Sequence, residues 1–156
     1  IQVIEHGDGN NNAATAFTVG DGIIGGNAGT LDYAALLKFW NQFDPYTMNT
    51  LLVSPDAMMA LLQCGEFQNP LTGLNFQGTG ELTNPLGAKL IKTSALPAGT
   101  LIGLDKRYAL EMIQASEVAV EYDRLIDRQL ERAAITSISG FAKLYTEASK
   151  LLRVGG

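Results

Sequence analysis

The sequence contains few of the residues from which proteins build reactive or cross-linked centres. Its 156 residues include one cysteine, Cys64, and one histidine, His6. A single cysteine cannot form an internal disulfide. Single copies also do not supply a metal cluster, a Ser–His–Asp triad or a Cys–His pair. The composition therefore predicts no catalytic residue, no metal ligand and no enzyme, and Cys64, beside Leu61 and Leu62, is expected to act as a small buried hydrophobe.

Long apolar runs and an excess of positive charge are also missing. No hydrophobic run reaches the roughly 18 residues that a membrane-spanning helix needs, so we expect no membrane partner. Eleven Lys and Arg against sixteen Asp and Glu give a formal net charge of −5. This balance argues against sequence-independent binding of nucleic acid over the whole surface. Hydrophobic residues make up 46% of the chain, enough for one domain or two small domains that share a core.

What the sequence does contain is a series of short apolar segments separated by turn residues. The sharpest local signal is Ser54-Pro55-Asp56. Serine is a good N-cap, proline fits the first helical position, and aspartate suits the first turn. These residues predict a strand at 50–53 followed by a helix that ends at Gly65.

The other elements follow from periodicity and breaker residues. A helix is expected near 30–43, with Thr30 as its N-cap and Asp44-Pro45 as its end. Strands 88–93 to 117–122 are joined by connections too short for crossover helices, which predicts a mainly antiparallel sheet. The full set adds strands at 1–4, 13–19, 100–104, 107–114 and 133–138, a long loop at 66–87 and a short helix at 146–152.

Two motifs match ligand-binding patterns only in part. Gly20 to Gly25 has the letters of a dinucleotide fingerprint, but that motif needs a helix to begin at once, and the helix is expected only near Thr30. A small α/β nucleotide-binding or enzyme domain that uses this loop is the alternative function. Asp8, Asn10 and Asn12 have the opening spacing of a calcium loop, which lacks its glycine at Ala13 and its glutamate at Val19. We expect a plain asparagine turn there, and no cofactor.

The stretch from Glu121 to Arg132 carries regularly placed charges. As a continuous strand, it would put every acid on one face and every arginine on the other. As a helix, it would stack like charges at i, i+4 spacing. Either geometry leaves charges that need partners from elsewhere, although a solvated face is equally consistent with the pattern. The candidate subunit-interface residues are Glu121, Asp123, Arg124, Asp127, Arg128, Glu131 and Arg132.

The order of several segments resembles the C-terminal part of tailed-bacteriophage major capsid proteins, which have the Hong Kong ninety-seven type coat fold and are relatives of encapsulins. The resemblance rests on NTLLVSPDAMMALLQ at 49–63, a glycine-rich loop, GAKLIKTSALPAGTLIGLDKRYALEMI at 87–113, and VAVEYDRLIDRQLERAAITSISGFAKL at 118–144. The family's N-terminal arm and extended loop are not recognisable. Since the sequence begins at Ile1 rather than Met, we expect a fragment or a chain whose start was removed.

The resemblance implies an α+β coat fold. Its peripheral domain, with a spine helix near 30–43, is expected at 1–48 and 119–156. Its axial domain, a mainly antiparallel sheet flanked by helices, is expected at 49–118. The implied function is a shell subunit of a phage or prophage capsid that forms pentamers and hexamers with copies of itself and encloses DNA without binding it directly. It also implies a virion location, synthesis in the bacterial host cytoplasm, and no small-molecule substrate.

Overall fold

A computed structural model describes residues 1–68, 86–125 and 130–155, with the backbone alone at 67–68, 117, 123–125 and 130–132, and it contains two β-sheets. The larger sheet has the strand order β1-β7-β4-β2-β3. Its central pairings, β2 with β4 and β4 with β7, are antiparallel, and the outer pairings, β1 with β7 and β2 with β3, are parallel. Its strands are β1 Thr15–Thr18, β2 Thr50–Val53, β3 Lys89–Lys92, β4 Thr100–Leu104 and β7 Ser149–Arg153.

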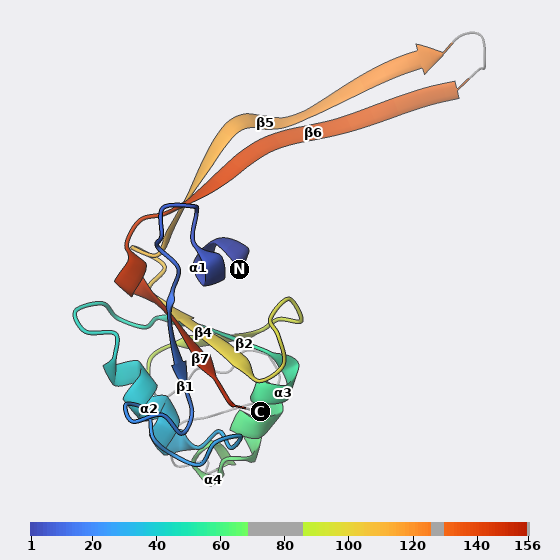
Figure 1. The fold of residues 1–156 in the computed structure, drawn as a ribbon. Helices are drawn as coiled ribbons and strands as arrows, with labels where there is room; N and C mark the ends of the chain where they lie inside the picture. Colours follow the sequence, from blue (N-terminus) through green and yellow to red (C-terminus); the bar gives the residue numbers. More distant parts are fainter. Residues whose placement is uncertain (69–85, 126–129, 156) are drawn as a thin grey trace.

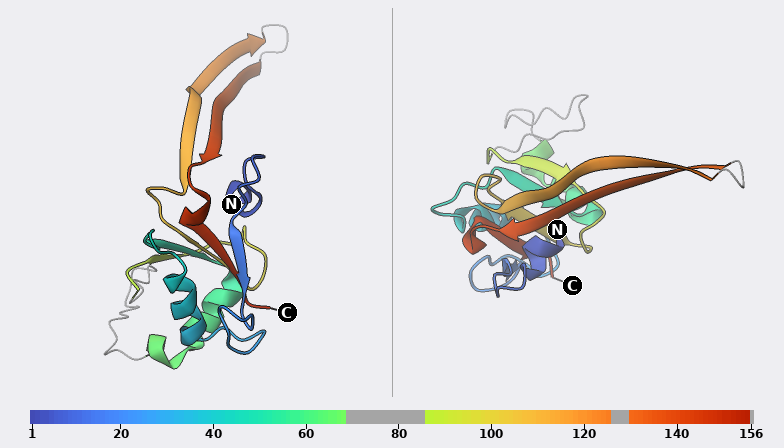
Figure 2. Two further views of the ribbon diagram at one scale, coloured as in Figure 1. Left: turned by 60° about the vertical axis from the view of Figure 1, so that its left-hand side comes forward. Right: turned by 90° about the horizontal axis from the view of Figure 1, so that it is seen from above.

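The second sheet is a long antiparallel ribbon of β5 Leu110–Leu125 and β6 Leu130–Lys143. It projects far from the body that holds the larger sheet (Figure 1). Figure 2 shows the same projection from two further directions. With the ribbon included, three of the five described strand pairings are antiparallel, which confirms the expected α+β class and differs from a doubly wound parallel sheet.

Two helices, α2 Tyr33–Asn41 and α3 Pro55–Gln63, cover one face of the larger sheet. Alternate strand residues point to opposite faces, so Leu51 and Val53 share a face with their antiparallel partners on β4. The core between helices and sheet includes the buried residues Phe17, Leu36, Phe39, Phe43, Leu51, Val53, Leu61, Leu101 and Leu152. Gly103 allows this packing, because a Cβ there would lie 2.6 Å from Cζ of Phe43.

The opposite face of the sheet packs against the short helix α1 Gln2–His6 and the base of the ribbon. The buried residues of this second cluster are Ile4, Leu96, Ile102, Leu104, Ala109, Ala148 and Leu151. The sheet is therefore covered on both faces, and both clusters draw residues from both ends of the chain. The division into peripheral and axial domains stays a prediction, and β1 and α2 share one core with β2, α3 and β4.

The strand–cap–helix prediction at 50–63 is confirmed. Ser54 Oγ accepts a hydrogen bond from the N–H of Ala57, and Pro55 is the first helical residue. The helix ends at Gln63 with Cys64 as its C-cap, which puts Gly65 at the predicted position just beyond the cap. Gly65 also begins a further short helix, α4 Gly65–Gln68. Most of the loop predicted at 66–87 lies outside the described residues.

The helix predicted near 30–43 is present but shorter. Its N-cap is Asp32, whose Oδ1 accepts a 2.7 Å hydrogen bond from the N–H of Ala35. Thr30 instead closes a turn, in which its N–H donates to the carbonyl of Asn27. Asp32 and Thr30 both favour the cap position, so the cap cannot be chosen from residue type alone.

Two predicted terminal elements are wrong. Residues 1–4 form the start of α1 rather than an edge strand, because Ile4 packs into the second core cluster and the turn closes through Glu5 N–H to the carbonyl of Ile1. Residues 146–152 were predicted as a helix, but only Thr146–Ala148 is helical, as the 3₁₀ turn η2. The remainder is β7, which pairs on both sides in the centre of the sheet, and this pairing outweighs helix propensity.

Candidate assembly surface

The pairing register of β5 with β6 is constant within each end of the ribbon, but it shifts twice between the two ends. Before the change Gln114 faces Ser139, and after it Ala119 faces Thr136. Strand β5 therefore takes five residue steps where β6 takes three, which makes two β-bulges in β5. Bulges bend a strand and increase its local twist. The strands predicted at 107–114 and 117–122 are joined by this bulged stretch into one element.

Because β5 contains two bulges, its alternate side chains return to the same faces of the ribbon after the bulged stretch. A single bulge would exchange the two faces. Met112 faces Phe141, Val120 faces Ile135, and Tyr122 faces Ala133. Residues directly opposite in an antiparallel pair share a face, and residues two apart on β6 do too. One face of the ribbon therefore carries Met112, Val120, Tyr122, Ile135 and Phe141, and we call these five residues the apolar ribbon face.

The apolar ribbon face is open to solvent. Tyr122 is 82% exposed and Ile135 is 70% exposed, and the other three side chains are also exposed. The opposite face carries Glu111, Glu121 and Thr136 together with Ile113 and Ile138. An isolated two-stranded ribbon is at best marginally stable in water, and contiguous exposed apolar patches mark interaction surfaces. The ribbon thus has the properties of a surface that is covered in an assembly.

A buried carboxylate ties the β5 side of the ribbon base to the body. Asp105, fully buried, accepts hydrogen bonds from Nδ2 of Asn49 at 2.8 Å and from the N–H of Thr47 at 3.2 Å. Arg107 donates to it from Nε at 3.1 Å and from Nη2 at 3.0 Å. The hydrogen bond from the Arg107 side chain is the largest cause that lowers the pKa of Asp105 to about 2. The carboxylate is therefore ionised and joins the loop before β2 to the turn before β5.

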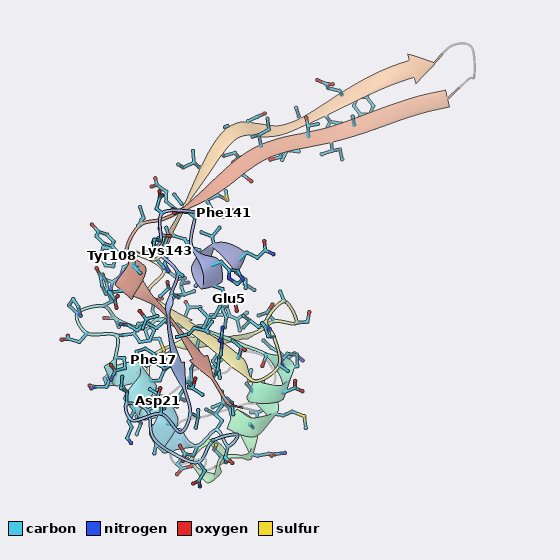
Figure 3. The ribbon with its side chains drawn as sticks, in the orientation of Figure 1. Glu5, Phe17, Asp21, Tyr108, Phe141 and Lys143 are labelled. Carbon is cyan, nitrogen blue, oxygen red and sulfur yellow. The ribbon has the colours of Figure 1, made fainter. Side chains whose placement is uncertain are left out.

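A buried lysine ties the β6 side to α1. Lys143 donates from Nζ to the carbonyl of Ile4 at 3.3 Å, and its N–H donates to Oδ2 of Asp8 at 3.2 Å. Burial lowers the pKa of the Lys143 ammonium, and the backbone bond from Lys143 lowers the pKa of Asp8. Figure 3 shows Lys143 and Phe141 at the point where the ribbon meets α1. Both strands of the ribbon are thus anchored at its base by charged groups.

The predicted interface residues that the structure describes lie at the far end of the ribbon. The backbone of 121–125 and 130–132 is β-strand, and the register sets Asp123 opposite Arg132 and Arg124 opposite Glu131. The chain reverses between these strands, so the acids and arginines do not form two single-sign rows along one continuous strand. Glu121 is exposed, and Asp127 and Arg128 lie outside the described residues. Their part in an interface stays a prediction.

Comparison with known proteins finds this architecture in solved structures but not in sequence families. No family model and no curated protein sequence matches the chain. Several solved structures have a similar fold, including the following three. The holo-SrpI encapsulin complex from Synechococcus elongatus matches with a TM-score of 0.64 at 15% identity, over 99% of this chain and 59% of its own. Mycobacterium phage Che8 matches at 0.60 and 12%, over 92% and 54%, and the virus-like particle from Pyrococcus furiosus at 0.56 and 11%, over 90% and 56%.

The chain has the Hong Kong ninety-seven type coat fold. It spans 54 to 59% of the length of these three proteins. The resemblance read from the order of sequence segments is confirmed by these structural matches, although each shares 15% identity or less.

Within the coat fold, the Gly20–Gly25 loop lacks the geometry of a dinucleotide site. The next helix begins only at Tyr33, after the Asp32 cap. The N–H groups of Ile23 and Ile24 donate to Oδ1 of Asp21 at 2.9 and 2.6 Å, so they are already used inside the loop. These backbone bonds, that of Ile24 above all, lower the pKa of Asp21. A pyrophosphate would need such donors free at a helix N-terminus.

The asparagine loop also uses side-chain oxygens of Asp8 and Asn12 in hydrogen bonds within the loop. Asp8 Oδ1 accepts from the N–H and the Nδ2 of Asn10, and Asn12 Oδ1 accepts from the N–H of Asp8 at 3.0 Å. This is the hydrogen-bonded turn that was predicted. No group of three or more His, Cys, Asp or Glu side chains among the described residues is arranged to hold a metal ion. In the part of the chain that the structure describes, no helix has the length and hydrophobicity to cross a bilayer.

Cys64 is half-buried beside α3, where its Sγ lies 3.5 Å from the carbonyl of Leu31. Burial raises the pKa of this thiol, which disfavours the nucleophilic thiolate.

Sequence reasoning missed the apolar ribbon face. The sequence shows alternating apolar residues in Met112 to Tyr122 and in Ala133 to Phe141. Because 107–114 and 117–122 were predicted as separate strands, the first of these patterns was divided. The anchoring residues Asp105 and Lys143 were also missed, because the partners that join them to the body and to the N-terminal segment lie 56 to 139 positions away in the sequence.

Proposed function

We propose that this chain is the structural shell subunit of a phage or prophage capsid, and that copies of it assemble into pentamers and hexamers that enclose DNA. The coat fold is the observation that carries the proposal. Its shell would be made in the bacterial host cytoplasm and would form part of the virion. The role is structural, with no catalytic step and no small-molecule substrate.

The apolar ribbon face supports self-association as the use of this fold. In the described part of the chain, the ribbon contacts the body at its base. While its five large apolar side chains face water, the free energy that their burial would release is not gained. Burying Ile135 and Val120 against another protein surface would contribute roughly 25 cal/mol per Å² of apolar area removed from water. We propose that neighbouring subunits cover this face, and that Glu121, Asp123, Arg124, Asp127, Arg128, Glu131 and Arg132 lie at subunit contacts near the ribbon end.

Electron microscopy of the full-length gene product tests the proposal directly. Closed shells with five- and six-fold capsomers are the expected result. A purified product that stays monomeric under all conditions of salt and crowding would contradict it. Nucleic acid extracted from shells made in the host, and protected from nuclease, is the expected readout for DNA enclosure.

A pair of adjacent variants tests the ribbon face. Ile135→Lys places a charge on the apolar ribbon face, whereas Thr136→Lys adds the same group one residue away on the opposite face. Ile135→Lys should reduce shell yield at least tenfold, because burying an unpaired ammonium is costly. Both sites are exposed, so both variants should keep their thermal unfolding within about 0.5 kcal/mol of the parent. Equal shell yields from the two variants would remove the apolar ribbon face from the assembly contact.

A further inference from the structure

A cleft is formed by the end of α2 and the loop that leads from it to β2. It has a volume of about 420 Å³ and is lined by Trp40, Asn41, Phe43, Asp44, Tyr46, Thr47 and Met48. Phe43 and Met48 are buried and form its floor, whereas Trp40 is 41% exposed. The described lining thus combines aromatic rings, an apolar floor and the carboxylate of Asp44, and it contains no positively charged side chain.

Beside the cleft, the chain holds a guanidinium group between an aromatic ring and a carboxylate. Tyr46 packs against Tyr108 and Tyr145 at ring-centroid distances of 5.8 and 6.1 Å. Arg107 places its guanidinium carbon 5.3 Å from the centre of the Tyr108 ring while it pairs with Asp105. An aromatic ring and a carboxylate therefore hold one guanidinium on that side of the tyrosines. The cleft repeats the ring and the carboxylate without the cation.

We propose that this cleft binds the guanidinium group of an arginine side chain supplied by a second copy of the chain. Tryptophan offers the most favourable aromatic face to a cation, and a planar guanidinium stacks on it better than an ammonium does. The methylene stem of the arginine would lie on Phe43 and Met48, and Asp44 would neutralise its charge. Exposed arginines are available. Arg153, for example, exposes 57% of its side chain and has only a 3.9 Å contact with Glu5.

Trp40 makes the site directly observable, because it is the only tryptophan in the chain. The experiment titrates the protein with N-acetyl-arginine amide, and in parallel with the neutral analogue N-acetyl-citrulline amide, at matched ionic strength while Trp40 emission is followed. A saturable change with half-saturation on the order of 1 mM is expected for the arginine compound. The citrulline compound should need at least about fivefold more, because it lacks the charge for the cation–π contact.

Matched variants separate the site from general charge effects. Asp44→Asn should raise the half-saturation for the arginine compound at least about threefold, in line with the loss of a partly exposed ion pair. Asp56→Asn removes the same charge from an exposed site on α3 and should leave it unchanged. Equal responses to both compounds, or an Asp44→Asn titration identical to the parent, would overturn the site.

The source of the arginine is tested by dilution. Trp40 emission of the protein alone should change with protein concentration, and the arginine compound should reverse this change. Binding of the compound without any concentration dependence would keep the cleft and overturn the second copy as its natural occupant. The titration does not depend on shell formation, so its failure and the failure of the proposed shell function can be told apart.

Discussion

At the residue scale, the least replaceable positions lie in β4 and the turn that follows it. Gly103 lies under the ring of Phe43, and Asp105 collects hydrogen bonds from three different residues. Neither position has a side chain of unusual chemistry. Their importance comes from what the tertiary structure places beside them.

Gly103→Ala should destabilise the protein by about 1 to 3 kcal/mol, because the added methyl group would lie 2.6 Å from Cζ of Phe43 and 2.8 Å from Sδ of Met48. Urea unfolding followed by Trp40 fluorescence measures the difference. Gly140→Ala on the ribbon is the control, since a Cβ there meets nothing within 4 Å. A loss equal to that of Gly140→Ala would show that Phe43 and Met48 move aside at little cost.

Asp105→Asn should cost about 2 kcal/mol at neutral pH, since an amide NH₂ would face donors that now point at a carboxylate oxygen. The pKa of Asp105 is lowered to about 2 in the folded protein from 3.8, so the carboxylate contributes its full stabilisation above about pH 4. That contribution is lost as the pH falls through 2. Unfolding at pH 7 and at pH 2 should therefore show a gap between parent and variant that narrows in acid. A gap of constant size would contradict the role of the charge.

At the scale of elements, local signals predicted the helix at 55–63, the strands at 50–53 and 100–104 and, within a few residues, α2, β1 and β3. Long-range contacts decided α1 and β7. Ser54 and Pro55 act on the next turn of their own helix, so their effect can be predicted from the sequence. The identity of β7 depends on β1 and β4, which lie about 135 and 50 residues earlier. The order of segments was enough for the coat fold, whereas the apolar ribbon face required the register across two bulges.

The charged end of the ribbon yields a test of whether its charges act within or between subunits. Arg124→Glu together with Arg128→Glu should weaken capsomer assembly and change unfolding by no more than about 0.5 kcal/mol. Arg124→Glu alone sets two acids opposite each other in the register, and adding Glu131→Arg restores opposite charges there. If the Arg124→Glu/Glu131→Arg variant still assembles poorly by light scattering at low salt, the charges act between subunits. Normal assembly of both double variants would assign them to the ribbon alone or to solvent.

At the scale of the whole molecule, the net charge of −5 bears on how a shell would treat its contents. An acidic subunit does not bind a polyanion through its general surface. Fluorescence anisotropy with a 30-base-pair duplex should therefore show a dissociation constant weaker than about 10⁻⁴ M at 150 mM salt, at the weak end of non-specific binding. Submicromolar affinity that falls steeply at higher salt would show that the positive charges gather in a patch that binds DNA despite the negative net charge.

The two bulges of β5 also set the course of the ribbon beyond the bulged stretch, because a bulge bends the strand that contains it. Two strips of unequal length that are joined at both ends must curve, as a bimetallic strip does when one layer expands. Over the bulged stretch β5 supplies five residue steps and β6 supplies three, a difference of about 7 Å of extended chain. The direction of the outer ribbon thus depends on the number of residues in the bulged stretch of β5 and not on any one side chain. Removing residue 115 and one of 117 and 118 would straighten the ribbon, leave its apolar alternation intact, and point the same contact surface at a different place in a shell.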